Sequence, residues 1–250
     1  ERKIVTTTET IREHFTTGGV PLGHGYTSQN ITDGTAYYTF EMAPFVRGIV
    51  LDTVNPNGES GGSISQTQLA WLEARLKEST GKVVVIYSHH PIASMDNLLI
   101  AIDDPSPRVL GPAVRDLLLT FPNVVAWVNG HTHRNSVLPQ KRASGGGFWE
   151  INTAAHIDWP AQARVLEILD NRDGTLSIFG TIIDAAAPLR YGGNIADTTG
   201  LTSLARELAA NDPQERSEAR RGAVGDRNVE LLVTAPFVIS PGSAPVKPAK

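Results

Sequence analysis

Two short apolar runs constrain the fold of this chain more than any other feature of its sequence. They read KVVVIYS at 82–88 and NVVAWVNG at 123–130. Runs this short and this uniformly apolar are typical of strands that are buried on both faces. Each run follows a segment with helical periodicity, so strands and helices alternate along the chain. This alternation predicts an α/β fold with parallel βαβ crossovers covered by helices.

The boundaries of the two helices can also be read from the sequence. Ser65 and Gln68 form a capping-box signature before the segment QLAWLEARLKES, and Gly81 follows its end. The second helix is expected around VLGPAVRDLLLTF and should stop before Pro122. With the helices placed in this way, each apolar run begins a new strand directly after a helix.

The remaining segments suggest how the domain is organised. Residues 1–35 are polar and rich in glycine, which predicts an irregular loop segment. Residues 36–190 should form the main part of the domain, with strands in TAYYTFEM and VRGIVLDTV and an antiparallel hairpin around the turn Asn-Arg-Asp-Gly. Residues 191–235 should add a helix, a solvated charged linker and a last strand, and residues 236–250 should form a disordered tail.

Composition limits the kinds of metal site and binding partner that this chain can have. The chain has 250 residues, no cysteine and a net charge of −4 without long runs of like charge. A thiolate metal site is therefore excluded, and nothing indicates a nucleic-acid or membrane partner. The first residue is Glu rather than Met, which suggests that the natural start lies upstream.

Four of the seven histidines directly follow the two apolar runs. His89 and His90 follow the first run, and His131 and His133 follow the second. The carboxyl ends of parallel strands share one edge of a sheet, so His89, His131 and His133 are expected to lie close together. If the segment is extended, His131 and His133 point to the same side because they are two residues apart. Imidazoles gathered in this way predict a metal site.

The motifs Ser-His-His-Pro at 88–91 and Gly-His-Thr-His at 130–133 resemble those of the calcineurin-like metallophosphoesterase superfamily. The segments LDTVNPNG, QLAWLEARL and DRNVELL are similar to an actinobacterial branch of exported members, over about positions 20–235. The resemblance implies the C-terminal part of an αββα sandwich and a small phosphate-ester substrate. It also implies that His89, His131 and His133 are ligands of two divalent ions (Mn, Fe or Zn), and that the protein acts outside the cytoplasm.

Other motifs of that superfamily are absent from this sequence. It contains no Asp-x-His; its one Gly-Asp is at 225–226, and Gly193-Asn194 is followed by Ile195 rather than by His. The carboxylate that would bridge two ions is therefore not found. Three hypotheses remain: a two-metal hydrolase of phosphate mono- or diesters, a mononuclear site of three histidines, and a truncated inactive fragment or binding module.

Four further residues are weaker candidates, each with an ordinary structural alternative. His90 could have a second-layer, substrate or structural role, and Asp52 could lie near the site or cap the turn that follows it. His24, in a Gly-His-Gly loop, could reach a substrate or simply be exposed. His156, with Asp158, could line the site. The sequence leaves the oligomeric state open.

Overall fold

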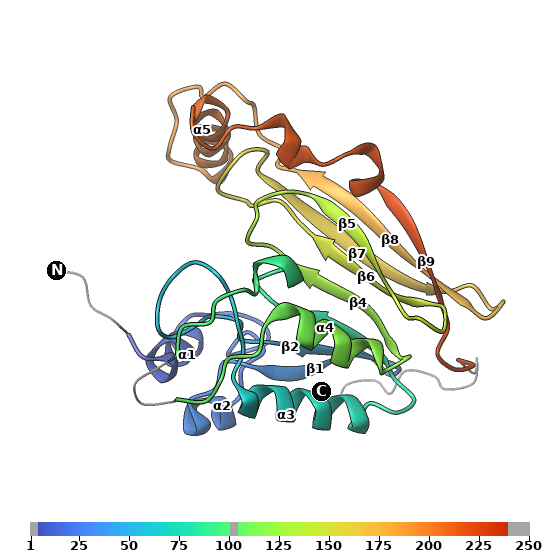
Figure 1. Ribbon diagram of the computed structural model, residues 1–250. Helices are drawn as coiled ribbons and strands as arrows, with labels where there is room; N and C mark the ends of the chain where they lie inside the picture. The colour runs from blue at the N-terminus through green and yellow to red at the C-terminus, as the bar shows by residue number, and fades with distance from the viewer. Residues whose placement is uncertain (1–4, 101–104, 240–250) are drawn as a thin grey trace. The chain divides into compact units, whose positions relative to one another are not determined.

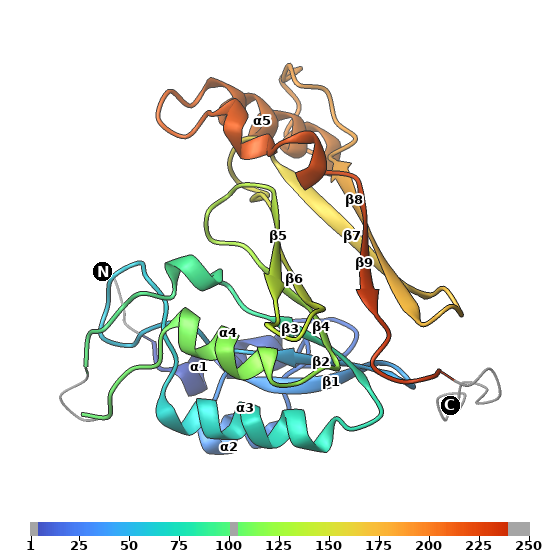
Figure 2. The ribbon, with the colours of Figure 1, turned by 45° about the vertical axis from the view of Figure 1, so that its right-hand side comes forward.

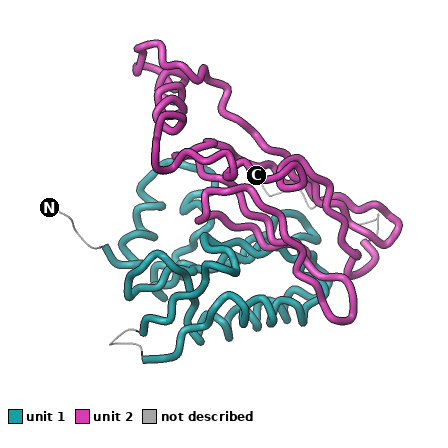
Figure 3. Tube along the Cα trace, turned by 45° about the horizontal axis from the view of Figure 1, so that its top comes forward, with its two compact units in different colours: residues 1–124, 241–250 teal, residues 125–240 magenta. Residues whose placement is uncertain are grey.

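The computed structural model describes residues 5–100 and 105–239. The chain divides into two compact units, residues 1–124 with 241–250 (unit 1) and residues 125–240 (unit 2) (Figure 3). This division differs from the single stretch 36–190 expected from sequence. Of the expected disordered tail, residues 240–250 lie outside the described part of the chain.

Unit 1 contains strands β1 (Tyr38–Ala43), β2 (Val46–Val50) and β3 (Val83–Tyr87), which pair in this order. β1 and β2 are antiparallel. β2 and β3 are parallel, with Val46 opposite Val83 and Val50 opposite Tyr87. The predicted βαβ crossover is confirmed for this pair, and the fold is mixed α/β.

The described part of unit 1 has five helical segments: α1 (Thr7–Thr16), α2 (Ser28–Asp33), α3 (Gln66–Glu78), the 3-10 turn η1 (Ile92–Ser94) and α4 (Gly111–Leu119). Two of them, α3 and α4, run alongside the strands of this unit (Figures 1 and 2). Their positions agree with the two helices predicted from sequence.

The predicted capping box of α3 is only half formed. The Ser65 hydroxyl accepts a hydrogen bond from Gln68 N at 3.1 Å, as expected. The Gln68 side chain, however, does not return to Ser65. Its amide accepts from Asp52 N at 2.8 Å and donates to Asp52 O at 2.7 Å. Gln68 therefore fixes the backbone that follows β2, which is a tertiary role that a local motif does not reveal.

The prediction of an irregular loop over residues 1–35 is wrong, because α1 and α2 lie within it. Thr6 caps α1 through a complete capping box. Its hydroxyl accepts from Glu9 N at 3.2 Å, and its N–H donates to the Glu9 carboxylate at 2.8 Å. Ile11 is fully buried on this helix. The Thr-x-x-Glu signal was present in the sequence but was outweighed by the polar composition.

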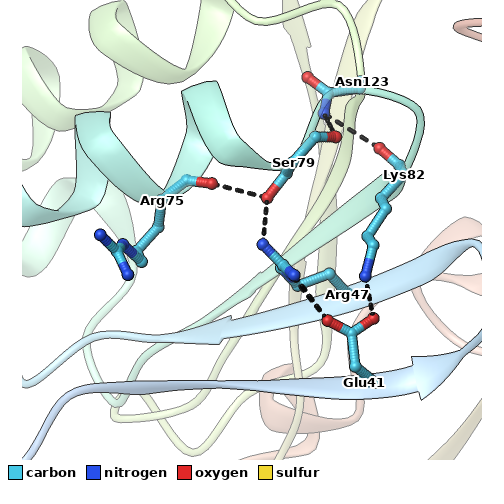
Figure 4. Close-up of polar contacts among 6 residues, drawn as sticks. All are labelled: Glu41, Arg47, Arg75, Ser79, Lys82 and Asn123. Carbon is cyan, nitrogen blue, oxygen red and sulfur yellow. Dashed lines mark hydrogen bonds and ion pairs between the residues drawn. The ribbon is translucent and has the colours of Figure 1, made fainter.

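A polar network ties the amino end of β3 to its neighbours (Figure 4). Glu41 on β1 forms ion pairs with Arg47 on β2 at 2.7 Å and with Lys82 at 2.6 Å. Arg47 also donates to the Ser79 hydroxyl at 3.2 Å. The buried Asn123 donates to the carbonyls of Ser79 and Lys82, both at 3.0 Å. Five side chains thus connect the amino end of β3 to the neighbouring strands and loops.

Apart from Val124, the first residue of β4, unit 2 contains a group of strands in the order β4 (Val124–Asn129), β6 (Gly147–Asn152) and β5 (Ser136–Lys141). β4 and β6 are parallel, whereas β5 and β6 are antiparallel. The sequence did not predict β5, which contains Pro139. Proline is compatible with a strand at the edge of a sheet, because its missing N–H can face outward.

A second, antiparallel sheet in unit 2 has the order β7 (Gln162–Asp170), β8 (Thr175–Asp184) and β9 (Val229–Thr234). The predicted hairpin is confirmed as β7 and β8, with Asp170 opposite Leu176. Trp149 on β6 donates its ring N–H to Leu232 O on β9 at 3.0 Å, so the two groups of strands are in contact.

The charged stretch expected as a solvated linker is instead structured. It follows α5 (Thr198–Asn211) and contains the 3-10 turns η2 (Glu218–Arg221) and η3 (Val224–Asp226). Arg220 O accepts from Asn135 N at 2.9 Å, and Asp226 accepts from Val137 N at 2.8 Å. Carboxylate and carbonyl groups in this stretch therefore complete the hydrogen bonding of the backbone beside β5. None of the described helices is long and apolar enough to span a membrane.

Candidate metal centre

In unit 1, the carboxyl end of β3 presents two histidines in different environments. Leu51 N donates to Tyr87 O at 2.8 Å, which continues the β2 to β3 pairing up to this point. The next residues diverge: the His89 side chain is exposed, whereas His90 is only 5% exposed. Their rings are nearly perpendicular, with centroids 4.8 Å apart. His89 is therefore the member of the pair that faces solvent.

His90 is held by partners on both ring nitrogens. Its Nε2 lies 2.9 Å from Ser60 O, and its Nδ1 lies 2.8 Å from the Thr53 hydroxyl. A carbonyl can only accept, so Nε2 carries the proton, and in the neutral ring Nδ1 accepts from Thr53. A Cβ atom at Gly62 would lie 2.5 Å from His90 Cγ, so the backbone packs directly on the ring. These contacts anchor the segment after β2.

Asp52 follows β2 and caps the next turn, as its structural alternative predicted. Its carboxylate accepts from Val54 N at 3.1 Å. Burial raises the pKa of Asp52, although the hydrogen bond from Val54 and the positive charge of Arg108 act in the opposite direction. A carboxylate whose charged form is poorly solvated gains from a nearby cation.

In unit 2, the Gly-His-Thr-His segment does not have the expected extended conformation. The φ angles of His131 and His133 are 66° and 53°. Both residues are left-handed, so the argument that alternating residues of a strand point to one side does not apply. Non-glycine residues in this region cost about 1–2 kcal/mol each. Such strain persists only where the surroundings impose it, and it is concentrated at functional sites.

A buried polar cluster, which sequence reasoning missed, holds this segment in place. Asn152 on β6 donates to Asn129 Oδ1 at 2.7 Å and also to Gly130 O. The Thr132 hydroxyl donates to Asn152 Oδ1 at 2.8 Å. Asn129 in turn donates to the buried Glu150 at 3.1 Å. Polar residues interrupting two otherwise apolar strands were the sequence signal that could have identified the cluster.

Asp158 orients the ring of His133. Its carboxylate makes a short hydrogen bond with His133 Nδ1, and the side chains are 21% and 30% exposed. A carboxylate that accepts from Nδ1 fixes the proton there and leaves Nε2 as the nitrogen that can bind a metal. Histidines that bind metals commonly have such a partner. The sequence predicts that Asp158 could line the site with His156, and the structure places its carboxylate against His133.

The segment η2 supports Asp158 from the other side. Arg220 Nη1 lies 3.6 Å from the Asp158 carboxylate, and Arg220 also pairs with Glu215. The guanidinium groups of Arg216 and Arg221 lie 5.1 Å and 4.5 Å from the centre of the Trp159 ring, within the range of cation–π attraction. The stretch expected to be a linker therefore fixes the residue that orients His133.

The other two candidates lie in different surroundings. His24 contacts His14, with their Nδ1 atoms 3.2 Å apart. His156 is exposed and lines a pocket of about 460 Å³ in unit 2, together with residues of β7, β8 and α5. His24 thus belongs to a histidine pair, and His156 to a separate pocket.

Comparison with known proteins adds a partial relationship. A probable glycerophosphodiester phosphodiesterase GpdQ from Arcobacter nitrofigilis is 32% identical over 91 residues, covering 36% of this chain and 32% of that protein. A glycerophosphodiester phosphodiesterase GpdQ from Enterobacter lignolyticus is 28% identical over 87 residues, covering 35% of this chain and 30% of that protein. The similarity thus spans about a third of the length of these relatives.

Two further comparisons complete this result. No protein-family model matches the chain. A solved dimetal phosphatase from Danio rerio aligns with a TM-score of 0.47 and 18% identity, covering 70% of this chain and 65% of that chain. The partial similarity to the GpdQ phosphodiesterases supports a calcineurin-like metallophosphoesterase relationship for the matched part of this chain.

Proposed function

We propose that this chain contributes the histidine ligands of a metal-dependent phosphoesterase. The observation that carries the proposal is the contact between Asp158 and His133, because it prepares one imidazole of the Gly-His-Thr-His motif to bind a metal through Nε2. The left-handed conformation of His131 and His133 supports it, since this strain is maintained by a buried polar cluster.

The proposed ligands are His89, His131 and His133. Each of His89, His90 and His131 can offer a ring nitrogen to a metal ion. His90 is the least suited of these, because Thr53 and Ser60 already bind its two ring nitrogens. His89 is exposed and His131 is half-buried, so both can meet an ion that enters from solvent.

The donor set fits a divalent ion of the kind that accepts imidazole together with carboxylate, namely Mn, Fe or Zn. We further propose two ions, with Asp52 as the first carboxylate to test as an additional ligand. Ions bound here would supply an activated hydroxide and neutralise the charge of the phosphoryl oxygens. The protein would supply His133 in a fixed tautomer and a rigid loop around it.

The substrate proposed is a small phosphate ester. The curated relatives are named as phosphodiesterases, which favours a diester over a monoester as the first compound to test. A location outside the cytoplasm, suggested by resemblance, remains part of the proposal.

Hydrolysis of aryl phosphates tests the function. The purified chain is assayed with bis(p-nitrophenyl) phosphate and p-nitrophenyl phosphate, with Mn²⁺ or Zn²⁺ and with a chelator. We expect hydrolysis that needs the ion and is lost in His89→Ala and His131→Ala but retained in the control His156→Ala. If the ion-loaded chain is inert on both compounds, or remains active with His131→Ala, the proposal is wrong. Activity with a single bound ion would instead favour a mononuclear site of three histidines.

A further inference from the structure

A second pair of histidines lies in unit 1. His14 is in the last turn of α1, and His24 is in the loop that joins α1 to α2. Their Nδ1 atoms are 3.2 Å apart, and their rings are nearly perpendicular, with centroids 5.3 Å apart. Two like nitrogens therefore face each other at close range.

The distance between the two Nδ1 atoms matches the distance between two nitrogen ligands of one metal ion. Nitrogen ligands lie about 2.0–2.1 Å from Zn²⁺, so two of them at the tetrahedral angle are about 3.3 Å apart. Without an ion, one ring must carry its proton on Nδ1 and donate it to the other. With an ion, both rings carry the proton on Nε2 instead, so binding needs only a change of tautomer.

The backbone prepares His24 for this role. Its φ is 53°, with Gly23 and Gly25 at 78° and 110° on either side. A Cβ atom at Gly19 would lie 2.4 Å from His24 Nε2, so that edge of the ring packs closely on the loop. Nδ1 is thus the nitrogen turned toward His14. A left-handed conformation is energetically unfavourable for residues other than glycine. At His24 this conformation directs Nδ1 toward His14.

Aromatic packing holds the partner ring. Tyr26 contacts His14, with centroids 5.1 Å apart, and Tyr38 contacts Tyr26 with centroids 5.0 Å apart. A Cβ atom at Gly25 would lie 2.6 Å from the Tyr38 ring, which shows how closely the loop is seated on β1. His24 is nevertheless exposed and His14 half-exposed, so the facing nitrogens are accessible to ions in solution.

We infer that His14 and His24 form a second binding site for a transition-metal ion, with ligands other than those of the proposed phosphoesterase site. The ions that prefer imidazole are Zn²⁺, Ni²⁺, Co²⁺ and Cu²⁺, whereas Mg²⁺ and Ca²⁺ prefer oxygen ligands. With two protein ligands, the remaining coordination positions are filled by water. The ion is therefore exchangeable, in contrast to a structural zinc held by four protein ligands.

The test uses the full chain carrying His131→Ala, so that its outcome does not depend on the proposed phosphoesterase site. Zn²⁺ bound per chain is measured by equilibrium dialysis. In this background, we expect His14→Gln and His24→Gln each to remove one ion per chain, whereas the matched exposed control His156→Gln removes none. An unchanged number of bound ions in either variant would overturn the inference.

Nitrogen NMR of the histidine rings gives a second readout, in which His14 and His24 are both intact. In the His131→Ala chain, addition of Zn²⁺ should shift the Nδ1 resonances of His14 and His24 together and leave that of His156 in place. If Zn²⁺ moves neither resonance, the two rings form only a hydrogen bond with each other and the site does not exist.

Discussion

The two ends of β3 use polar side chains in opposite ways. At the amino end, Glu41 pairs with both Arg47 and Lys82, and the buried Asn123 satisfies two backbone carbonyls. At the carboxyl end, His89 is directed to solvent beside a buried neighbour. Polar groups at the amino end join neighbouring strands, whereas the exposed His89 at the carboxyl end is a proposed metal ligand.

This contrast separates stability from function within a single strand. Buried groups with hydrogen bonds inside the protein should affect unfolding when they are removed, whereas solvent-exposed groups should affect unfolding less and ligand binding more. His89 and His90 are adjacent in sequence, yet they should fall on opposite sides of this division. The experiments below test the division, from the largest expected effect to the smallest.

Replacing His90 should produce the largest loss of stability. His90→Leu removes the donor to Ser60 O and the acceptor of the Thr53 hydroxyl proton, and unsatisfied buried groups cost about 1–3 kcal/mol each. We expect the free energy of unfolding in urea to fall by about 2–4 kcal/mol. The exposed neighbour is the control, and His89→Ala should change it by less than about 0.5 kcal/mol. Equal losses in both variants would remove the contrast between the two residues.

In unit 2, we expect replacement of Asp158 to reduce metal binding more than stability. Asp158→Asn removes the charge that orients His133, and loss of such a partner typically costs about 10–100-fold in metal affinity. Titration with Zn²⁺ monitored by calorimetry measures the change. The exposed Asp116→Asn serves as the matched control. An affinity unchanged by Asp158→Asn would show that this carboxylate does not prepare His133.

At the amino end of β3, Asn123→Ala should weaken folding without affecting metal binding. The carbonyls of Ser79 and Lys82 lose their shared donor, so unfolding in urea should become easier by about 1–2 kcal/mol. Zn²⁺ affinity, measured on the same preparation, should remain that of the unaltered chain. A parallel loss of metal affinity would mean that the two ends of the strand are coupled.

The smallest effect is expected at Glu41, whose carboxylate is partly exposed. Burial would raise the pKa of Glu41, but hydrogen bonds from Lys82 and Arg47 and their charges together lower it. Because the folded pKa is depressed, its contribution is present above the ordinary value of 4.5 and is lost as pH falls below it.

Glu41→Gln should therefore cost less than about 1 kcal/mol at pH 7 and nothing in acid, since exposed ion pairs contribute little. Urea unfolding of both proteins between pH 3 and pH 7 measures the difference. A gap that grows toward low pH would contradict the assigned direction.

The sequence predicted the elements whose signals are local. Apolar runs located β3 and β4, leucine spacing and Ser65 located α3, and an Asn-Arg-Asp-Gly turn located the hairpin of β7 and β8. The missed element β5 contains a proline that is tolerated only because the strand lies at an edge, which is a property of the sheet rather than of the segment. Gln68 shows the same limit, because its partner Asp52 is sixteen residues away.

For the candidate site, the sequence suggested the histidine ligands that remain proposed, but not the residues that support them. Residue type and position after an apolar strand were sufficient to select His89, His131 and His133. The left-handed backbone of His131 and His133 could not be read in this way, because it depends on Asn152 and Thr132. The pairing of His14 with His24 likewise depends on a loop conformation that places two separated residues together.

The most direct test of the proposed metal centre is the number of ions bound per folded chain, measured by elemental analysis after dialysis against Mn²⁺ or Zn²⁺. The His24→Gln background removes the contribution of the second histidine pair. We predict two ions per chain in that background and loss of at least one in His131→Ala. No bound ion, or a number unchanged by His131→Ala, would contradict the assignment of these histidines as metal ligands.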